Sequence, residues 1–404
     1  MKIIVQKFGG TSVSSSESRR IVLKKIIDKV KEGYHVVVVV SAMGRKGSPY
    51  STDSLLDLIN KEALNPREID LLLSCGEIIS GVTLSSMIRE KGYKAKVLTG
   101  RLAGIKTNDN FGNAEVLDVD PSNIINSLKD GNIVIVAGFQ GVNSNGEITT
   151  LGRGGSDITA VVLGKALHCN QVEIFTDVDG VMTADPNIVE NAKVIKTMCY
   201  SEVYQLAENG AKVIHPKAVE IAQQSNISLV IKNTFTDSEG TIIEKADTNF
   251  YNNRKKQFND KILTGITFKK GRNQIKVKTD DEKNETERLM NDITINKINI
   301  DLINFFIDEK IFTVEDKDLP VMTNILKEGN YKYDIIKNCC KLSAVGYKMH
   351  GVPGVMAKIV NALWKNNIKI LQSSDSHNTI WCLIYEKDAE AALKILHEEF
   401  EMYK

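Results

Sequence analysis

Three short aliphatic runs stand out in the first half of the chain: Val36–Val40, Ile133–Ala137 and Val172–Phe175. Each run is continuous rather than alternating, which is typical of strands buried on both faces of a parallel sheet. Parallel strands need long connections, usually helices. We expect these helices at residues 18–31, 54–60, 68–90, 121–129 and 157–167. The first part of the chain is therefore predicted to be an α/β domain.

Small and polar residues follow each of the three runs. They are Ser41–Gly44, Gly138–Gly141 and Thr176–Gly180. Open α/β sheets bind ligands at the carboxyl ends of their strands. We therefore expect one crevice to collect these three loops.

The pattern changes around residues 247–261, which are rich in Asn, Lys and Arg and almost free of aliphatic residues. Such a segment is typical of an exposed connection between domains. Beyond it, short alternating strands such as Gln274–Lys278 and Trp381–Tyr385 are interspersed with modest helices, which favours an α+β fold. A weak repeat relates Asn299–Leu302 to Asn367–Ile370, with Ile300 and Ile368 68 residues apart. We predict domains at 1–246, 262–338 and 339–404.

Charge and composition reduce the range of possible functions. The 404 residues include 52 Lys and Arg and 51 Asp and Glu, a net charge of +1, which offers no basic field for nucleic acid or an anionic membrane. The longest aliphatic run is far too short to cross a bilayer, and the N-terminus lacks the pattern of a signal peptide. We expect a cytoplasmic protein. The six cysteines lack metal-ligand spacing, so we expect neither disulfides nor a metal site formed by the protein.

The first candidate site is Lys7–Ser12, which follows the apolar residues Ile3–Val5. At the end of a strand, its backbone amides and one ammonium are suited to a polyphosphate. Neither the P-loop spacing nor the dinucleotide-binding glycine pattern is present. A glycine turn with a solvated lysine is the alternative interpretation.

A second candidate, Thr149–Asp157, combines three glycines, Arg153 and a helix that we expect to start at Ser156 or Asp157. Arg153 is suited to clamp a carboxylate through paired hydrogen bonds. Alternatively, Arg153 is a surface residue and Asp157 a helix cap.

Acidic residues mark two further places. Glu77 lies in an apolar helical neighbourhood, where it is either exposed or a buried counter-charge for an ammonium. Thr176–Gly180 supplies hydroxyl and carboxylate groups after a predicted buried strand, as a nucleotide or its metal requires. An Asp-Gly turn without a ligand is the alternative there.

Taken together, the motifs resemble those of an aspartokinase. They are KFGGTSV at residues 7–13, SCGE at 74–77, TTLGRGGSD at 149–157, TDVDGVMTADP at 176–186 and GAKVIHP at 210–216. MHGVPGVMAKIV at 349–360 resembles the loop and helix of an ACT domain. The resemblance implies an amino-acid kinase fold, similar to that of carbamate kinase, with an open and mainly parallel sheet. Two α+β, ferredoxin-like ACT modules would follow it.

The resemblance also implies a reaction and roles for matching residues. ATP, with Mg²⁺ held mainly by its phosphates, would phosphorylate the β-carboxylate of L-aspartate, and no base is needed because that carboxylate is ionised at neutral pH. Lys7 and Asp157 would be catalytic. The aspartate site would comprise Ser41, Thr52, Glu77, Arg153, Gly154, Gly155 and Ser156. The nucleotide site would comprise Lys7, Gly9, Gly10, Thr176, Asp177, Met182, Lys212 and Val213.

The ACT modules imply feedback inhibition by an amino acid, for which we favour lysine, and a homodimer or homotetramer. The predicted effector wall is Met349, Val352, Pro353, Gly354, Val355, Ser373, Ser374 and Asp375. Core packing explains its apolar members equally well, and Asp301 in the first module is an alternative partner for a lysine ammonium.

Three residues depart from the family pattern. Met182 and Asn187 stand where tyrosine and arginine are usual, and Glu115 stands where many relatives have arginine, so we leave Glu115 outside the site. A kinase with another acceptor and an amino-acid sensor without turnover are the competing hypotheses.

Overall fold

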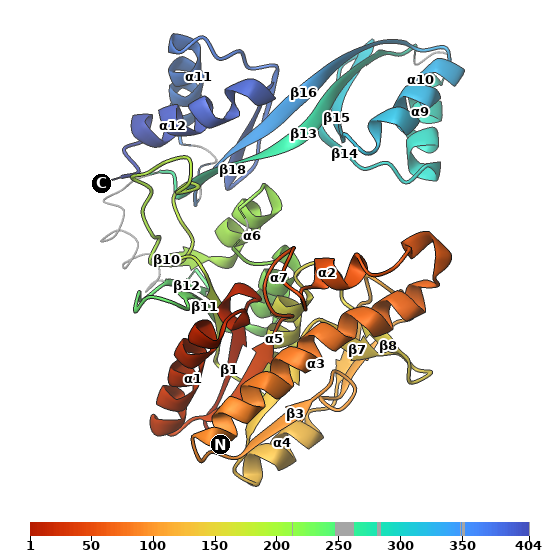
Figure 1. Cartoon of the computed structure of the whole chain (residues 1–404). Coiled ribbons are helices and arrows are strands. Elements are labelled where there is room, and N and C mark those ends of the chain that lie inside the picture. Colours follow the sequence, from red (N-terminus) through yellow and green to blue (C-terminus); the bar gives the residue numbers. More distant parts are fainter. Residues whose placement is uncertain (212, 247–261, 281–283, 348, 350–351, 404) are drawn as a thin grey trace. The chain divides into compact units, whose positions relative to one another are not determined.

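The computed structural model describes the chain except residues 212, 247–261, 281–283, 348, 350–351 and 404 (Figure 1). It divides into two compact units. The first comprises residues 1–181, 194–207 and 212–259, and the second comprises 182–193, 208–211 and 260–404. Each unit is described by itself below.

An eight-stranded sheet forms the centre of the first unit. Its order is β10 (Thr197–Cys199), β12 (Thr241–Glu244), β11 (Ser228–Asn233), β9 (Gln171–Thr176), β1 (Ile3–Phe8), β2 (His35–Val40), β6 (Ile133–Ala137) and β3 (Ala95–Leu98). The strands from β11 to β3 are parallel, and β12 runs antiparallel to β11. The three aliphatic runs form β2, β6 and most of β9, so their prediction is confirmed.

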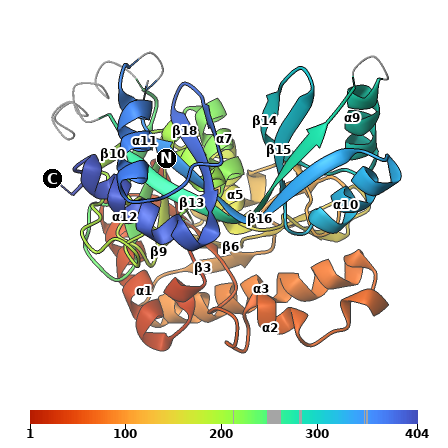
Figure 2. The ribbon, with the colours of Figure 1, turned by 90° about the horizontal axis from the view of Figure 1, so that it is seen from above.

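Helices cover both faces of this sheet, as expected (Figure 2). Val36, Val38 and Val40 share a core with α1 (Ser16–Lys31) and α3 (Pro66–Glu90). Residues of a strand point alternately to opposite faces. On the other face, α5 (Gly155–Ala166) contacts β1, β2 and β9, and α7 (Pro216–Ser225) packs on α5. The described residues of this unit also form α2 (Thr52–Leu56), α4 (Ser122–Lys129) and α6 (Tyr200–Glu208), and 3-10 turns lie at Thr11–Val13 and Lys61–Ala63.

The predicted helix at 54–60 is displaced in the structure. Helix α2 begins at Thr52, because the Ser51 hydroxyl accepts a hydrogen bond from the N–H of Ser54 and so caps the helix at an earlier residue. Beside the large sheet lies a smaller one, ordered β5 (Val116–Val119), β4 (Ile105–Thr107), β7 (Gln140–Val142) and β8 (Ile148–Thr150).

Of the described residues, α3 is the helix that is long and apolar enough to cross a membrane by length and composition, and half of that apolar stretch is buried. Core helices of globular domains pass the same test. Helix α3 contacts β3, β6 and β8, and it carries the buried carboxylates of Asp70 and Glu77.

A six-stranded antiparallel sheet forms the second unit. Its order is β14 (Ile300–Phe305), β15 (Glu309–Glu315), β13 (Gly265–Lys278), β16 (Lys332–Val345), β18 (Thr379–Tyr385) and β17 (Gln372–Asp375). Helices α9 (Glu285–Ile295) and α10 (Leu319–Glu328) cover one end of it, and α11 (Val355–Lys365) and α12 (Ala389–Glu399) cover the other. The predicted boundary at 338/339 falls inside β16, because β13 and β16 run through both modules.

The internal repeat exists, but the predicted spacing of 68 residues is wrong. Asn296 and Asn366 follow α9 and α11, and each side-chain amide donates to a carbonyl of its own helix, at 2.8 and 2.9 Å. The N–H of Ile298 bonds to Ile293 O, and the N–H of Ile368 bonds to Leu363 O. These equivalent residues are 70 apart. The sequence comparison paired Asn299-Ile300 with Asn367-Ile368, whereas in the structural register Ile298 and Ile300 correspond to Ile368 and Ile370.

Candidate active site

The turn after β1 contains Gly9 and Gly10. The N–H of Gly9 donates to Phe175 O in β9 (3.2 Å), and the N–H of Gly44, in the loop after β2, donates to Gly10 O (2.9 Å). A Cβ on Gly10 would lie 2.6 Å from Gly44 O, so only glycine allows this approach. The turn is therefore bounded by the end of β9 and by the loop that follows β2.

Lys7 and Asp157 form an ion pair beside this turn. Lys7 Nζ lies 2.7 Å from Asp157 Oδ1, and the two side chains are 12% and 11% exposed. The other carboxylate oxygen accepts a hydrogen bond from the N–H of His215 (3.3 Å). The interpretation of Asp157 as a helix cap is wrong, because α5 begins at Gly155, two residues earlier than Asp157, with Gly154 at its N-cap. The pairing instead holds the Lys7 ammonium at the carboxyl end of β1.

Glu77 is buried, so its interpretation as an exposed residue is wrong: its exposed fraction is 2%. A Cβ on the preceding Gly76 would lie 2.8 Å from the Ala42 side chain, so glycine lets α3 approach the loop after β2. The N–H of Ala42 donates to Glu77 Oε1 (3.0 Å), while Oε2 is buried without a hydrogen-bond partner among the described residues. Burial raises the pKa of Glu77 to about 8, although the Ala42 hydrogen bond opposes the shift.

The loop from β8 to α5 carries Arg153, whose side chain is exposed. A carboxylate from α3 fixes the start of this loop. Asp70, fully buried, accepts hydrogen bonds from the N–H and hydroxyl of Thr150, both at 2.7 Å, and from the N–H of Gly112 (2.9 Å). Asp70 therefore joins α3, the end of β8 and the turn at Gly112.

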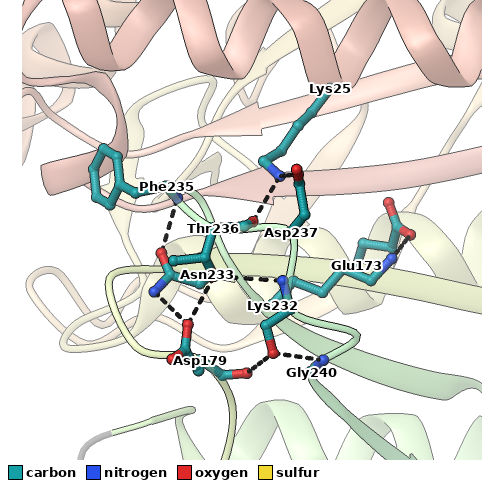
Figure 3. A network of polar contacts seen from close by, with 10 residues as sticks. Lys25, Glu173, Asp179, Lys232, Asn233, Phe235, Thr236, Asp237 and Gly240 are labelled. Atoms are coloured by element: carbon teal, nitrogen blue, oxygen red, sulfur yellow. Dashed lines mark hydrogen bonds and ion pairs between the residues drawn. The ribbon is translucent and has the colours of Figure 1, made fainter.

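The loop after β9 is held by polar contacts with the loop after β11 (Figure 3). The Asp179 carboxylate accepts hydrogen bonds from Asn233 Nδ2 (2.8 Å) and Thr236 Oγ1 (2.7 Å), and its carbonyl accepts one from Ser238 Oγ (3.2 Å). Lys25 of α1 donates to Thr236 O (3.2 Å). These contacts hold the loop that begins at Asp177, directly after Thr176 at the end of β9.

The structure thus gathers most of the predicted site residues around the carboxyl ends of β1, β2 and β9. Ser41 directly follows β2, and Thr52 is the first residue of α2. Gly154, Gly155 and Ser156 form the start of α5, and Ser156 is buried. Lys212 lies outside the described residues, so its predicted role has no structural account, and Val213 is next to it in sequence. Met182 belongs to the second unit.

Two residues that the sequence analysis missed belong to this region. Asp70 lies seven residues before Glu77, on the same face of α3, and an acid within an apolar helix was the signal in both cases. Arg45 forms an ion pair with Asp177. Its signal was the basic pair enclosed by Gly44 and Gly47 directly after a buried strand.

A separate cavity of about 300 Å³ lies in the second unit. Its wall includes six of the predicted effector residues, namely Met349, Val352, Val355, Ser373, Ser374 and Asp375, together with Met356, Ser376 and Ile380. Pro353 and Gly354 complete the loop, with Gly354 at the N-cap of α11. Asp301 does not line this cavity, because its carboxylate pairs with the buried Lys341 ammonium.

A larger cavity in the first unit, about 970 Å³, lies between β5, α5 and α7, and Lys7, Glu77, Arg153 and Asp157 are not in its lining. Glu115 borders it and pairs with Lys217 at 3.0 Å. Among the described residues, no group of three His, Cys, Asp or Glu side chains is arranged to hold a metal ion.

Comparison with known proteins gives the family. Residues 2–233 match the amino acid kinase family, and residues 334–398 match an ACT domain. Aspartokinase 1 of Bacillus subtilis is 45% identical over 407 residues, covering 100% of both chains. The chain belongs to the aspartokinase family. It is therefore an enzyme, a kinase that acts on aspartate, and the predicted fold and family are confirmed.

Other aspartokinases agree with this assignment. The Geobacillus stearothermophilus aspartokinase is 39% identical, over 99% of this chain and 97% of its own length. The structure of E. coli aspartokinase III in complex with aspartate and ADP has a TM-score of 0.79 at 23% identity, covering 98% of this chain and 99% of that one. At that identity the likeness shows the shared fold.

Proposed function

We propose that this aspartokinase transfers the γ-phosphoryl group of ATP to the β-carboxylate of L-aspartate, giving 4-phospho-L-aspartate. The observation that carries the proposal is the Lys7–Asp157 ion pair beside the glycine turn, together with the buried Glu77 carboxylate. The E. coli relative with aspartate and ADP supports the choice of ligands.

Positioning and charge neutralisation suffice for this reaction. The β-carboxylate of aspartate is ionised at neutral pH, so the enzyme needs no general base. In a loose transition state, charge develops on the oxygens of the transferring phosphoryl group. Lys7, oriented by Asp157, would neutralise part of that charge, and the N–H groups of the glycine turn would bind phosphate oxygens.

The substrate aspartate would be held by its α-ammonium and α-carboxylate groups. The unpartnered Oε2 of Glu77 is suited to its ammonium, and Arg153 to its α-carboxylate through paired hydrogen bonds. Ser41, Thr52 and the start of α5 would line the same site.

Magnesium would enter with the nucleotide. Mg²⁺ prefers oxygen ligands and is commonly bound by substrate phosphates with one or two carboxylates. Asp177, one-third exposed at the start of the β9 loop, is the carboxylate best suited to assist.

For regulation we propose that lysine binds the cavity beside α11, where Ser373, Ser374 and Asp375 offer polar groups to an amino acid. The E. coli enzyme in complex with lysine and aspartate supports this choice. We further propose a homodimer or homotetramer formed through the ACT modules, and a cytoplasmic role in the first step of lysine, threonine and methionine biosynthesis.

The test is hydroxylamine trapping of the acyl phosphate with ATP and aspartate, with and without lysine and threonine. Formation of aspartyl hydroxamate that lysine suppresses is the expected result. Glutamate, offered as a matched acceptor, should give little product. Hydroxamate from glutamate but not aspartate would establish another acceptor, and ADP binding without product from either would favour the sensor.

A further inference from the structure

Arg45 lies at the edge of the proposed phosphate site without an assigned role. In the large sheet, β1 lies between β9 and β2. Asp177 follows β9, the glycine turn follows β1, and Arg45 lies five residues beyond the end of β2. The ion pair between Arg45 Nη2 and Asp177 Oδ2 therefore joins the loops that follow the two strands on either side of β1.

The backbone around Arg45 is a tight turn. Gly44 and Gly47 both have left-handed backbones, with φ of +86° and +92°. The N–H of Ser48 donates to Arg45 O (2.8 Å), and Ser48 Oγ accepts from the N–H of Arg45 (3.4 Å). A Cβ on Gly44 would lie 2.3 Å from Ser48 Oγ. The local sequence thus fixes where the arginine backbone stands, while the side chain extends from it.

The ion pair between the Arg45 side chain and its carboxylate partner is exposed and therefore weak. The arginine side chain is 73% exposed and that of Asp177 is 33% exposed. Exposed ion pairs contribute about 0–1 kcal/mol. A guanidinium has five N–H donors, so most of those of Arg45 are available to a second anion. By contrast, Lys7 is largely buried against Asp157.

We propose that Arg45 is a phosphate-binding residue of the nucleotide site. In the absence of nucleotide it pairs with Asp177, and on binding its guanidinium contacts oxygens of the terminal phosphates that the glycine turn holds. Arginine suits this role because its planar fork binds phosphate through two hydrogen bonds at once. The inference rests on the proposed nucleotide site.

The test compares binding of ADP and AMP by calorimetry, in the presence of Mg²⁺, to the full chain and its Arg45→Ala variant. The variant should bind ADP about tenfold more weakly, a loss typical of a charge-assisted hydrogen bond, and bind AMP within about threefold of the wild type. Arg45→Lys should fall between them, because it keeps the charge and loses the fork. Lys46→Ala is the matched control, since it removes a neighbouring exposed charge, and it should change ADP binding by less than about twofold.

A second comparison separates direct contact from positioning of Asp177. Arg45→Ala should still weaken ADP binding in an Asp177→Ala background, whereas an effect that vanishes there would make Arg45 a positioning residue and overturn the proposal. Equal losses for Arg45→Ala and Lys46→Ala, equal losses for ADP and AMP, or no loss at all would also overturn it. A wild type that binds no ADP would instead refute the nucleotide site on which the inference rests.

Discussion

The two carboxylates on the inner face of α3 show how one residue type serves two purposes. Asp70 receives three hydrogen bonds, from Thr150 and Gly112, whereas Glu77 receives one from Ala42. A carboxylate with several donors is satisfied and structural, while one with an unpartnered buried oxygen is costly unless a ligand completes it. Asp70 therefore stabilises the fold by linking α3 to Thr150 and Gly112, and Glu77 is the residue suited to bind a cation.

This difference predicts a pH dependence of aspartate binding. With a pKa of about 8, Glu77 is mostly protonated at neutral pH in the free enzyme, and an ammonium requires its ionised form. As pH rises toward 8 the proton leaves, so KM for aspartate should fall, by roughly tenfold per pH unit between pH 6 and 7 and less steeply above. The measurement is a pH series of KM at saturating MgATP.

Two variants sharpen that experiment. Glu77→Gln should raise KM and abolish its dependence on pH over this range, because no titrating group remains opposite the ammonium. Glu90→Gln, the same change at the exposed end of the same helix, should leave the profile unaltered. A wild-type profile that is flat from pH 6 to 8 would contradict the assignment of Glu77.

At the residue scale, the sequence predicted Lys7, Glu77 and Asp157 as chemically important, because a charged residue beside glycines or in an apolar helix is conspicuous. It left the interpretation of Glu77 open between exposed and buried, since burial depends on α3 meeting the loop after β2. Arg45 was missed for a related reason. Its partner is 132 positions away, and only the order of the strands brings the two together.

At the element scale, Asp70 connects α3 to the end of β8 through its hydrogen bonds with Thr150. Asp70→Asn should disturb the loop that carries Arg153, because the amide oxygen is neutral and a weaker acceptor for the two N–H groups than the carboxylate. The amide NH₂ can only donate, so the Thr150 hydroxyl must also turn from donating to accepting. We expect KM for aspartate to rise about tenfold while the affinity for ADP changes by less than about threefold, since the loop faces the acceptor. Steady-state kinetics and ADP calorimetry measure the two effects.

The matched change Asp130→Asn, at the exposed C-cap of α4, should alter neither quantity. A parallel loss of ADP and aspartate binding in Asp70→Asn would show that the carboxylate supports the whole unit and not the acceptor loop. Thermal unfolding of the variant distinguishes that outcome, because a general loss of support lowers the melting temperature along with both affinities.

The elements themselves differed in how well the sequence foretold them. Strands β2 and β6 were predicted because a strand covered on both faces must be apolar at every position. Strands β13 and β16 were not predicted at their full length of 14 residues. Each mixes charged and apolar residues because its two halves belong to different modules, and no single period describes both.

At the scale of the whole molecule, the chain does not divide in sequence order. Residues 182–193 leave the first unit just after the β9 loop and pack in the core of the second, where Ala184 and Val189 join the residues of α11 and α12. Thr183 adds polar contacts to this packing. Its hydroxyl lies 2.9 Å from His397 Nε2, and its carbonyl accepts a hydrogen bond from the N–H of Ile266 (2.8 Å).

Through this segment, the cavity proposed for the effector is connected along the chain to the loop proposed for the nucleotide. Met349 and Val355 line the cavity and belong to the same core as Ala184 and Val189, so an amino acid bound there would press on the packing that holds residues 182–193. In sequence, the segment directly follows Asp177–Val181, which belong to the first unit. Sequence alone could not reveal this, since the segment reads as part of a nucleotide loop and its partners lie up to 214 positions away.

Thr183→Val should therefore weaken inhibition by lysine while sparing catalysis. Valine keeps the volume and removes the hydroxyl that links the segment to α12, so the coupling between lysine binding and activity should weaken. The lysine concentration needed for half inhibition should therefore rise several-fold. The turnover number without lysine should stay within about twofold, because the proposed catalytic groups keep their contacts. Thr323→Val, which removes a hydroxyl from α10 in the same unit, is the control, and lysine should inhibit it as strongly as it inhibits the wild type. If Thr183→Val folds with a similar melting temperature and is inhibited normally, the link through α12 carries no regulation, and coupling must pass through the remaining crossings of the chain between the units.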